Sequence, residues 1–433
     1  MRVIALLRRQ IMEIRVGGLT VFIRKFRRLP GACVSVVSTL LALPVALAIR
    51  LLQPWITIRL GGLISSRIGH FAMNTELYLC ERDARINVPS GNYVDFLYLG
   101  HHPICNRTLV DMWKRVFPIW PRWLLGPIDR ANRIVPGGAV HSIGGNATPA
   151  EDRRNLLDRF PPHLKFTPEE EAQGKAALQR MGIDFDTPFV CLFVRDSAYL
   201  DSHLPPPQSG GWGYHNFRDS DIKNYVAVTE ELAHRGYFVI RMGAKVHAAL
   251  PSKHPRVIDY ASNGLRSEFL DIYLGANCAF CISTGAGWDA IPEMFRRPIV
   301  HVNFCPLWRI RTSRTVFLSI TKKHVLRTTR AALTMREIFT YGVENAVAAL
   351  DYTSRGVELV ENTPEEIRDI VIEMAERLEG KWQPHENDEI LQRRFWEIFQ
   401  TDAVNSYDGL RLHGEIRGRF GAAFLRNNPG WLQ

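Results

Sequence analysis

The pattern of apolar and polar positions predicts a doubly wound α/β domain in the second half of the chain. Near-continuous apolar runs alternate there with segments whose apolar residues recur at helical spacing. Such runs are typical of parallel strands that helices cover on both faces. The predicted strands are 189–196, 237–243, 257–261, 279–283 and 298–303, and the predicted helices include 222–235 and 266–276.

The first half shows the same alternation over a shorter stretch. Apolar runs at 56–63 and 92–100 predict strands, and the periodic segment 71–81 between them predicts a helix. A region rich in Pro, Gly and Arg from 118 to 168 follows, and we expect it to lead to the joint between domains. This half is therefore predicted to be a second, smaller Rossmann-like domain.

Two helices are predicted from their start signals. Thr167 and Thr363 each precede Pro-Glu-Glu, which places an N-cap residue before acidic residues of the first turn. The second of these helices is expected to run to about Gly380, and another helix is expected at 389–399. The chain then divides into 1–55, a first domain at 56–187, a second domain at 188–360, and helices at 361–433 that pack back on the first domain.

The N-terminal part has the pattern of a membrane contact. Leu29–Ile49 is an uncharged run of 21 residues, close to the ~20 that span a bilayer as a helix. Pro30 and Pro44 weaken a straight span, and basic residues stand on both sides of the run, which favours a re-entrant or interfacial segment on the cytoplasmic face. A buried core helix is the alternative, and the late start of the run argues against a cleaved signal peptide.

Composition narrows the choice of partner. The formal charge of +10 suggests an anionic partner, but basic residues crowd the first 28 positions and no nucleic-acid motif is present. We therefore expect a membrane surface rather than nucleic acid. The odd number of cysteines, seven, among apolar neighbours fits a reducing compartment, and Cys278 and Cys281 lack the second pair that a zinc site needs.

Candidate chemistry centres on a glycine turn, Ser283-Thr284-Gly285-Ala286-Gly287, between a predicted strand and a predicted helix. In a doubly wound sheet, ligands bind beyond the carboxyl ends of strands, where helix amides attract phosphates. Gly285 and Gly287 permit close approach of a ligand, and Ser283 or Thr284 can donate a hydroxyl. The turn predicts an anion site formed by backbone amides, with a simple packing turn as the alternative.

This turn, followed by a helix containing Pro292-Glu293 and by Arg297-Pro298 before the next strand, resembles the donor-binding turn of nucleotide-sugar enzymes with the GT-B fold. With the further segments that share this likeness, the chain resembles a bacterial family of glycosyltransferases found near surface-polysaccharide genes. Those segments are RIGHFAMNTELYL (67–79), YHNFRDSD (214–221), RMG (241–243) and RSEFLDIY (266–273).

The resemblance implies a GT-B-like architecture with an acceptor domain, a donor domain and sugar transfer in the cleft between them. It implies no cofactor beyond a nucleotide-sugar co-substrate, and metal is usually dispensable in that fold. Many such enzymes carry two glutamates eight residues apart in the donor domain, whereas this chain has Glu293 but Gly285. That departure favours an inverting enzyme.

Further donor-binding residues are expected at strand ends and in a long loop. Arg195 and Arg241, with Gly243, stand at the ends of two predicted strands, although either arginine can equally be a salt-bridging residue. The loop 197–217 is long enough to predict a functional segment, and Tyr214–Arg218, with His215 and Arg218, is expected to act as a lid. A surface excursion is the alternative. Asp219-Ser220-Asp221 imitates a DxD metal motif, but its place at a helix start favours N-capping.

The candidate general base is His70, because the ordinary pKa of histidine lies near neutrality. Arg67 and Gly69 beside it are candidates for binding an acceptor phosphate or the donor diphosphate, and Asn74 lies one helical turn further on. Asp95, at the centre of a predicted strand, is the rival base. The resulting hypothesis is a membrane-associated glycosyltransferase of cell-envelope glycan or lipid-linked acceptors. A nucleotide-sugar epimerase or hydrolase and a non-catalytic glycan- or lipid-binding protein are the alternatives.

Overall fold

The structure is a computed structural model that describes residues 12, 29–143, 150–184, 186–203, 212–402 and 413–433. The chain forms two compact units. Unit 1 takes in 1–63, 87–101 and 118–144, and unit 2 takes in 64–86, 102–117 and 145–433. The domain boundary near residue 188 stays a prediction.

Unit 1 is built on a three-stranded parallel sheet in the order β1-β2-β3. Strand β1 (Thr57–Leu63) pairs with β2 (Tyr93–Leu99) over seven residues, from Thr57 opposite Tyr93 to Leu63 opposite Leu99. The short β3 (Ile119–Trp120) pairs with β2. The two strands expected from the apolar runs of the first half are confirmed.

Helices α2 (Leu29–Leu52) and α5 (Arg122–Ile134) pack together in unit 1. Their contact is made of small residues, Ala42 and Ala46 of α2 with Ala131 of α5. Within the described part of the chain, α2 from Pro30 to Leu52 is the helix whose length and composition would allow it to cross a membrane. Helix α5 falls in the region rich in Pro, Gly and Arg, for whose start the sequence predicted no helix.

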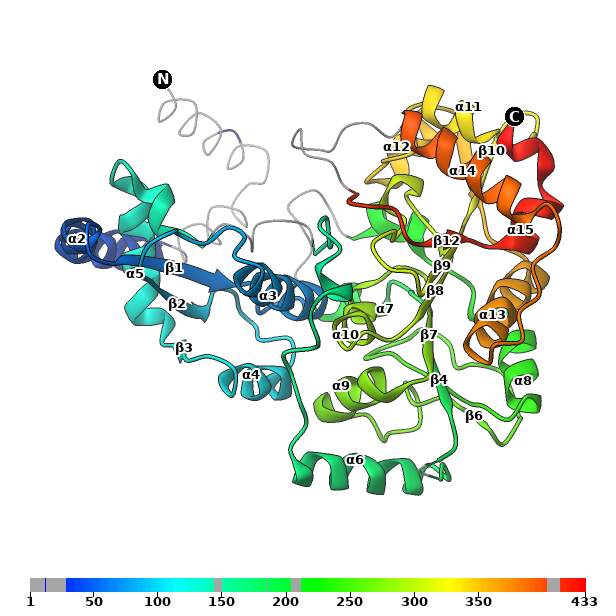
Figure 1. Cartoon of the computed structure of the whole chain (residues 1–433), viewed down its shortest axis with the longest axis horizontal. Coiled ribbons are helices and arrows are strands. Elements are labelled where there is room, and N and C mark those ends of the chain that lie inside the picture. Colours follow the sequence, from blue (N-terminus) through cyan, green and yellow to red (C-terminus); the bar gives the residue numbers. More distant parts are fainter. Residues whose placement is uncertain (1–11, 13–28, 144–149, 185, 204–211, 403–412) are drawn as a thin grey trace. The chain divides into compact units, whose positions relative to one another are not determined.

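Unit 2 contains a seven-stranded sheet in the order β12-β9-β8-β7-β4-β5-β6, and every neighbouring pair is parallel. Figure 1 shows α8 and α13 on one face of this sheet and α9 and α10 on the other. The α/β class with parallel sheets is confirmed. The strands are β4 (Phe189–Phe193), β5 (Phe238–Arg241), β6 (Val257–Ile258), β7 (Phe280–Ser283), β8 (Ile299–Phe304), β9 (Phe317–Thr321) and β12 (Arg419–Phe420).

Two helices of unit 2 begin where the sequence signals place them. Helix α6 (Pro168–Arg180) and helix α13 (Pro364–Leu378) each start with a capping box, at Thr167 and Thr363. The others are α3 (Ile68–Asp83), α4 (Arg107–Lys114), α7 (Ala198–His203), α8 (Val226–His234), α9 (Glu268–Asn277), α10 (Ala290–Met294), α11 (Met335–Thr340), α12 (Ala349–Thr353), α14 (Asp388–Asp402) and α15 (Ala422–Asn427). An antiparallel pair, β10 (Lys323–Leu326) and β11 (Val357–Val360), stands beside the main sheet.

The C-terminal helices belong to the core of unit 2. Ile370 and Met374 of α13 and Phe395 and Phe399 of α14 are buried in the same apolar cluster as Val300 of β8. Packing of these helices on the first domain stays a prediction. The cluster fixes the strands whose carboxyl ends surround the candidate site.

Candidate functional site

A cavity of about 590 Å³, called here the first cavity, opens in unit 2 beyond the carboxyl ends of β4 and β7. Its walls come from the start of α3, the segment after β4, the 3₁₀ segment Gly213–Arg218, the turn after β7 and the segment after β8. This is the place where parallel α/β sheets bind ligands. Predicted site residues that line it are Arg67, Gly69, His70, Arg195, His215, Arg218, Gly243, Gly285, Ala286 and Gly287.

The glycine turn after β7 is held by hydrogen bonds within itself. The hydroxyl of Ser283 donates to Oδ2 of Asp289 (2.9 Å) and accepts from the amide of Gly285 (3.0 Å). The amide of Ala286 donates to the same Asp289 oxygen (3.0 Å). Gly285 has φ 74° and lies against the ring of Phe304, so a side chain would not fit. Ser283 and Asp289 therefore accept the amides of Gly285 and Ala286 within the turn, and an anion site formed by the amides of this turn stays a prediction.

The N-terminus of α3 forms another part of the cavity wall. Arg67 is the N-cap residue of this 16-residue helix and makes no side-chain capping bond. Ser66, Arg67, Ile68, Gly69 and His70 all line the first cavity. The positive end of the helix dipole favours a bound anion at this wall.

Positive charge predominates around the first cavity. Seven arginine and lysine side chains line it, against four carboxylates. Arg195 is buried, pairs with the carboxylate of Asp219 and donates to the carbonyl oxygen of His215 (3.2 Å). The cations are Arg67, Arg195, Arg218, Lys245, Arg266, Arg309 and Arg311, and the acids are Glu151, Asp196, Asp271 and Asp289.

The 3₁₀ segment Gly213–Arg218 carries the lid residues that the sequence predicted. Arg218 donates through Nη2 to the carbonyl oxygen of Gly285, which ties this segment to the glycine turn. Burial lowers the pKa of His215 to about 4, with the charges of Arg218, Arg195 and Arg67 acting in the same direction. His215 is therefore neutral at pH 7 and offers hydrogen bonds rather than charge. Residues 204–211 of the loop 197–217 lie outside the described residues.

His70 sits in the first turn of α3, half-buried at the cavity wall. Its Nδ1 lies 3.3 Å from Oδ1 of Asn74, one turn along the helix as the sequence predicts. Asn74 itself is buried and is absent from the described lining of the cavity. This pair orients the His70 ring at the cavity wall.

Other predicted site residues are buried behind the wall or lie elsewhere. Arg241 forms an ion pair with Asp259 (3.2 Å), which is the salt-bridging role that the sequence analysis gave as the alternative to donor binding. The hydroxyl of Thr284 accepts from the amide of Arg195 (3.0 Å), and Glu293 is fully buried in α10, where burial raises its pKa to about 7. Asp95 lies in unit 1 in an ion pair with Arg59 (2.6 Å).

Several residues at the first cavity were not predicted. Arg309 and Arg311 follow β8, and the three arginines of the segment Trp308–Arg314 were the available signal. Asp271 in α9 lines the cavity and pairs with Arg266 (2.6 Å), while burial raises the pKa of Asp271 to about 6. Its place inside the motif RSEFLDIY was the available signal.

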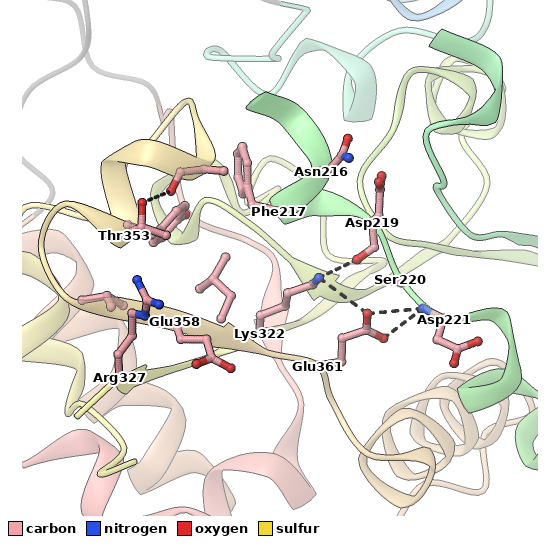
Figure 2. A pocket seen from close by; sticks show the side chains of 14 residues that line it. Asn216, Phe217, Asp219, Ser220, Asp221, Lys322, Arg327, Thr353, Glu358 and Glu361 are labelled. Atoms are coloured by element: carbon pink, nitrogen blue, oxygen red, sulfur yellow. Dashed lines mark hydrogen bonds and ion pairs between the residues drawn. The ribbon is translucent and has the colours of Figure 1, made fainter. Parts of the chain in front are cut away.

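A second cavity of about 570 Å³ lies on the other side of Gly213–Arg218. Figure 2 shows Lys322 reaching the backbone oxygen of Asp219 (2.6 Å) and the carboxylate of Glu361 (3.8 Å), which also accepts from the amide of Asp221. Phe217 lines both cavities. Asp221 caps the 3₁₀ turn Ile222–Tyr225, as the capping interpretation predicts, whereas Asp219 pairs with Arg195.

No protein-family model matches the sequence, and the search of curated proteins found no match. Solved structures with a similar chain trace include a glycosyl transferase family 9 protein from Veillonella parvula, at 10% identity and TM-score 0.35 over 58% of this chain and 82% of that one. An ADP-heptose lipopolysaccharide heptosyltransferase II from E. coli matches at 13% identity and TM-score 0.31, over 56% and 84% of the two chains. An E. coli heptosyltransferase with ADP-2-deoxy-2-fluoro heptose matches at 11% identity and TM-score 0.26, over 57% and 88%.

Proposed function

We propose that the protein is a glycosyltransferase that moves a sugar from a nucleotide-sugar donor to a cell-envelope acceptor. The observation that carries this proposal is the first cavity, where a helix N-terminus and seven cationic side chains stand beyond the carboxyl ends of β4 and β7. A nucleotide sugar carries two phosphates, and an excess of positive charge in a partly enclosed site favours binding of a diphosphate.

The cationic wall would also assist the chemical step. As the bond between the anomeric carbon and the diphosphate oxygen breaks, its electron pair leaves with the nucleoside diphosphate, and negative charge grows on that group. Fixed cations and helix amides stabilise such charge more in the transition state than in the bound donor. Arg67, Arg195 and Arg218 are the side chains that we assign to this role.

The acceptor hydroxyl must lose a proton as its oxygen bonds to the anomeric carbon from the opposite face, which inverts the configuration. We assign this proton to Nε2 of His70, whose Nδ1 is oriented by Asn74. Asp95 remains the rival base of the sequence, and its tight pair with Arg59 favours His70. No cofactor or metal is invoked for this step.

The acceptor is proposed to be a glycan or a lipid-linked molecule at the cytoplasmic face of the inner membrane. The support is the apolar helix α2 and the basic residues that precede it in the sequence. Nucleic acid is not proposed as a partner, because the excess of basic residues lies in the first 28 positions and the sequence contains no nucleic-acid motif.

The donor is best tested by thermal unfolding of the full chain with UDP, GDP, CMP and dTDP sugars. A donor at a hundredfold excess over its Kd should stabilise the protein by about 2.7 kcal/mol and raise Tm by a few degrees. Transfer to envelope lipid extracts should then fall at least a hundredfold in His70→Ala, while the donor-induced shift of Tm persists. Release of free sugar or isomerised donor without an acceptor would favour the hydrolase or epimerase instead, and absence of any shift would favour a non-catalytic protein.

A further inference from the structure

Helix α2 of unit 1 exposes apolar residues and turns its polar residues toward the protein, which is the reverse of a helix on a water-exposed surface. Its buried and half-buried residues recur three or four positions apart and so form one side of the helix. They are Ser35, Ser38, Thr39, Ala42, Leu43, Ala46, Ile49 and Arg50. All four polar or charged residues between Pro30 and Leu52 are in this set, so the polar side chains of α2 face the protein.

These polar side chains are hydrogen-bonded within unit 1. Arg130 of α5 donates through Nε to the hydroxyl of Thr39 (3.0 Å) and through Nη2 to the hydroxyl of Ser38 (3.2 Å). Arg50 donates through Nη2 to the carbonyl oxygen of Asn132 (3.1 Å). The protein-facing side of α2 thus resembles the polar, small-residue contacts by which helices associate in lipid.

The opposite half of α2 is exposed and entirely apolar. It includes Leu41 and Leu51, each 74% exposed, and Val34, which is 68% exposed. A 24-residue helix is about 36 Å long, so this face forms one continuous apolar strip. Water-soluble monomers rarely expose an apolar patch of that extent, and such a patch indicates a surface that is covered in the working protein.

Aromatic and basic residues next to this strip indicate which partner covers it. Trp55, 72% exposed, follows the end of α2, and Trp123, 78% exposed, lies two turns before Arg130 on the side of α5 that contacts α2. Tryptophan favours the level of lipid headgroups. Basic residues also crowd the first 28 positions of the sequence, which complements anionic headgroups.

We propose that α2 lies in the plane of the membrane, with its apolar half in the hydrocarbon of one leaflet and α5 at headgroup level. A membrane-spanning placement conflicts with the packing of the other half of α2 against the protein. This packed side runs from Ser35 to Arg50, and the neighbouring helix α5 carries Arg130 and the Arg133–Asp129 ion pair (2.8 Å). A spanning α2 would carry these charges into hydrocarbon, where charged side chains are costly. This inference concerns unit 1 alone and does not depend on the proposed sugar transfer.

Depth measurements on the full chain separate the in-plane placement from its rivals. Cys33 is the exposed cysteine among the described ones, and Cys105 is half-buried, so a Cys105→Ser background directs an environment-sensitive fluorophore to Cys33. Leu41→Cys and Leu51→Cys, each with Cys33→Ala, place the same fluorophore further along the exposed half. Lys381→Cys, at an exposed position of unit 2, is the matched control.

With vesicles of mixed neutral and anionic phospholipid that carry quenchers at known depths, positions 33, 41 and 51 should be quenched at one common depth and position 381 should not. A spanning helix would instead give the deepest quenching at 41, with 33 and 51 near opposite surfaces, and would overturn the proposal. Emission that changes with protein concentration but not with vesicles would show that a second copy covers the strip, and would overturn it as well.

A charge placed on the strip gives an independent test. Leu41→Asp should lower the vesicle partition coefficient at least tenfold, whereas Lys381→Asp should change it less than threefold. Equal partitioning of Leu41→Asp and the unsubstituted protein, with both folded by circular dichroism, would contradict the in-plane placement.

Discussion

The backbones of Gly69 and Gly287 touch. A side-chain carbon built on Gly69 would lie 2.8 Å from the carbonyl oxygen of Gly287 and 2.9 Å from its Cα. The first turn of α3 is thereby held directly against the turn after β7, within unit 2. The helix amides and the glycine turn therefore form one continuous wall of the first cavity.

Gly69→Ala should separate these two elements. The added methyl group meets backbone rather than a movable side chain, so we expect a loss of about 1–3 kcal/mol in the free energy of unfolding and weaker donor binding. Gly287→Ala is the matched control, because its nearest neighbour, the Gly69 nitrogen, is at an ordinary 3.5 Å. Thermal unfolding measures both, and a Gly69→Ala protein as stable as the Gly287→Ala protein would disprove the close contact.

Ser283→Ala should loosen the glycine turn. The substitution leaves the buried amide of Gly285 without its acceptor, which costs about 1–3 kcal/mol. Ser319→Ala in β9 serves as the comparison, because the Ser319 hydroxyl is buried without a hydrogen-bond partner among the described residues. Chemical unfolding should show a loss in the first variant and little change in the second. Equal losses would mean that the Ser283 bonds contribute nothing specific.

His163 should make the stability of unit 2 depend on pH. Burial lowers its pKa, but hydrogen bonds to Glu76 (3.1 Å) and Asp83 (2.9 Å) and the charges of those groups raise it by more, so the net pKa is raised. A raised histidine pKa stabilises the folded state fully below the unfolded value of about 6.5, and that stabilisation is lost as pH rises through the folded value.

The variant His163→Gln removes this effect. Its deficit in unfolding free energy relative to the unsubstituted protein should be largest near pH 6 and should shrink by pH 9. His385→Gln, at an exposed position, should show no such trend. A deficit that stays constant across this pH range would exclude a charged His163 in the folded protein.

The sequence revealed most of the second sheet because its strands are buried on both faces. All four residues of β7 and all six of β8 are buried, so each appears as a near-continuous apolar run. Helix α5 was missed because Gly126 and Pro127 stand at its centre and local propensity favours a break there. Strand β12 is only two residues long, which is too short to give a pattern.

The site was predictable to the level of segments but not of hydrogen bonds. The strand-turn-helix pattern located the glycine turn, and the N-terminal position in α3 located Arg67, Gly69 and His70. Which amides stay available depends on Asp289 and Ser283 as acceptors, and that geometry has no local signal. Similarly, nothing in the order Asp219-Ser220-Asp221 showed that one carboxylate would cap a turn and the other would pair with Arg195.

The central claim, that the first cavity binds the diphosphate of an activated sugar, is tested most directly by calorimetric titration with the donor that the thermal screen selects. Arg67 is exposed at the cavity wall, so Arg67→Gln should weaken binding roughly ten- to hundredfold through loss of a charge-assisted hydrogen bond. Arg368→Gln, at an exposed position in α13, should leave the Kd unchanged. Saturable binding that is equally strong in all three proteins, or no binding of any nucleotide sugar, would contradict the account.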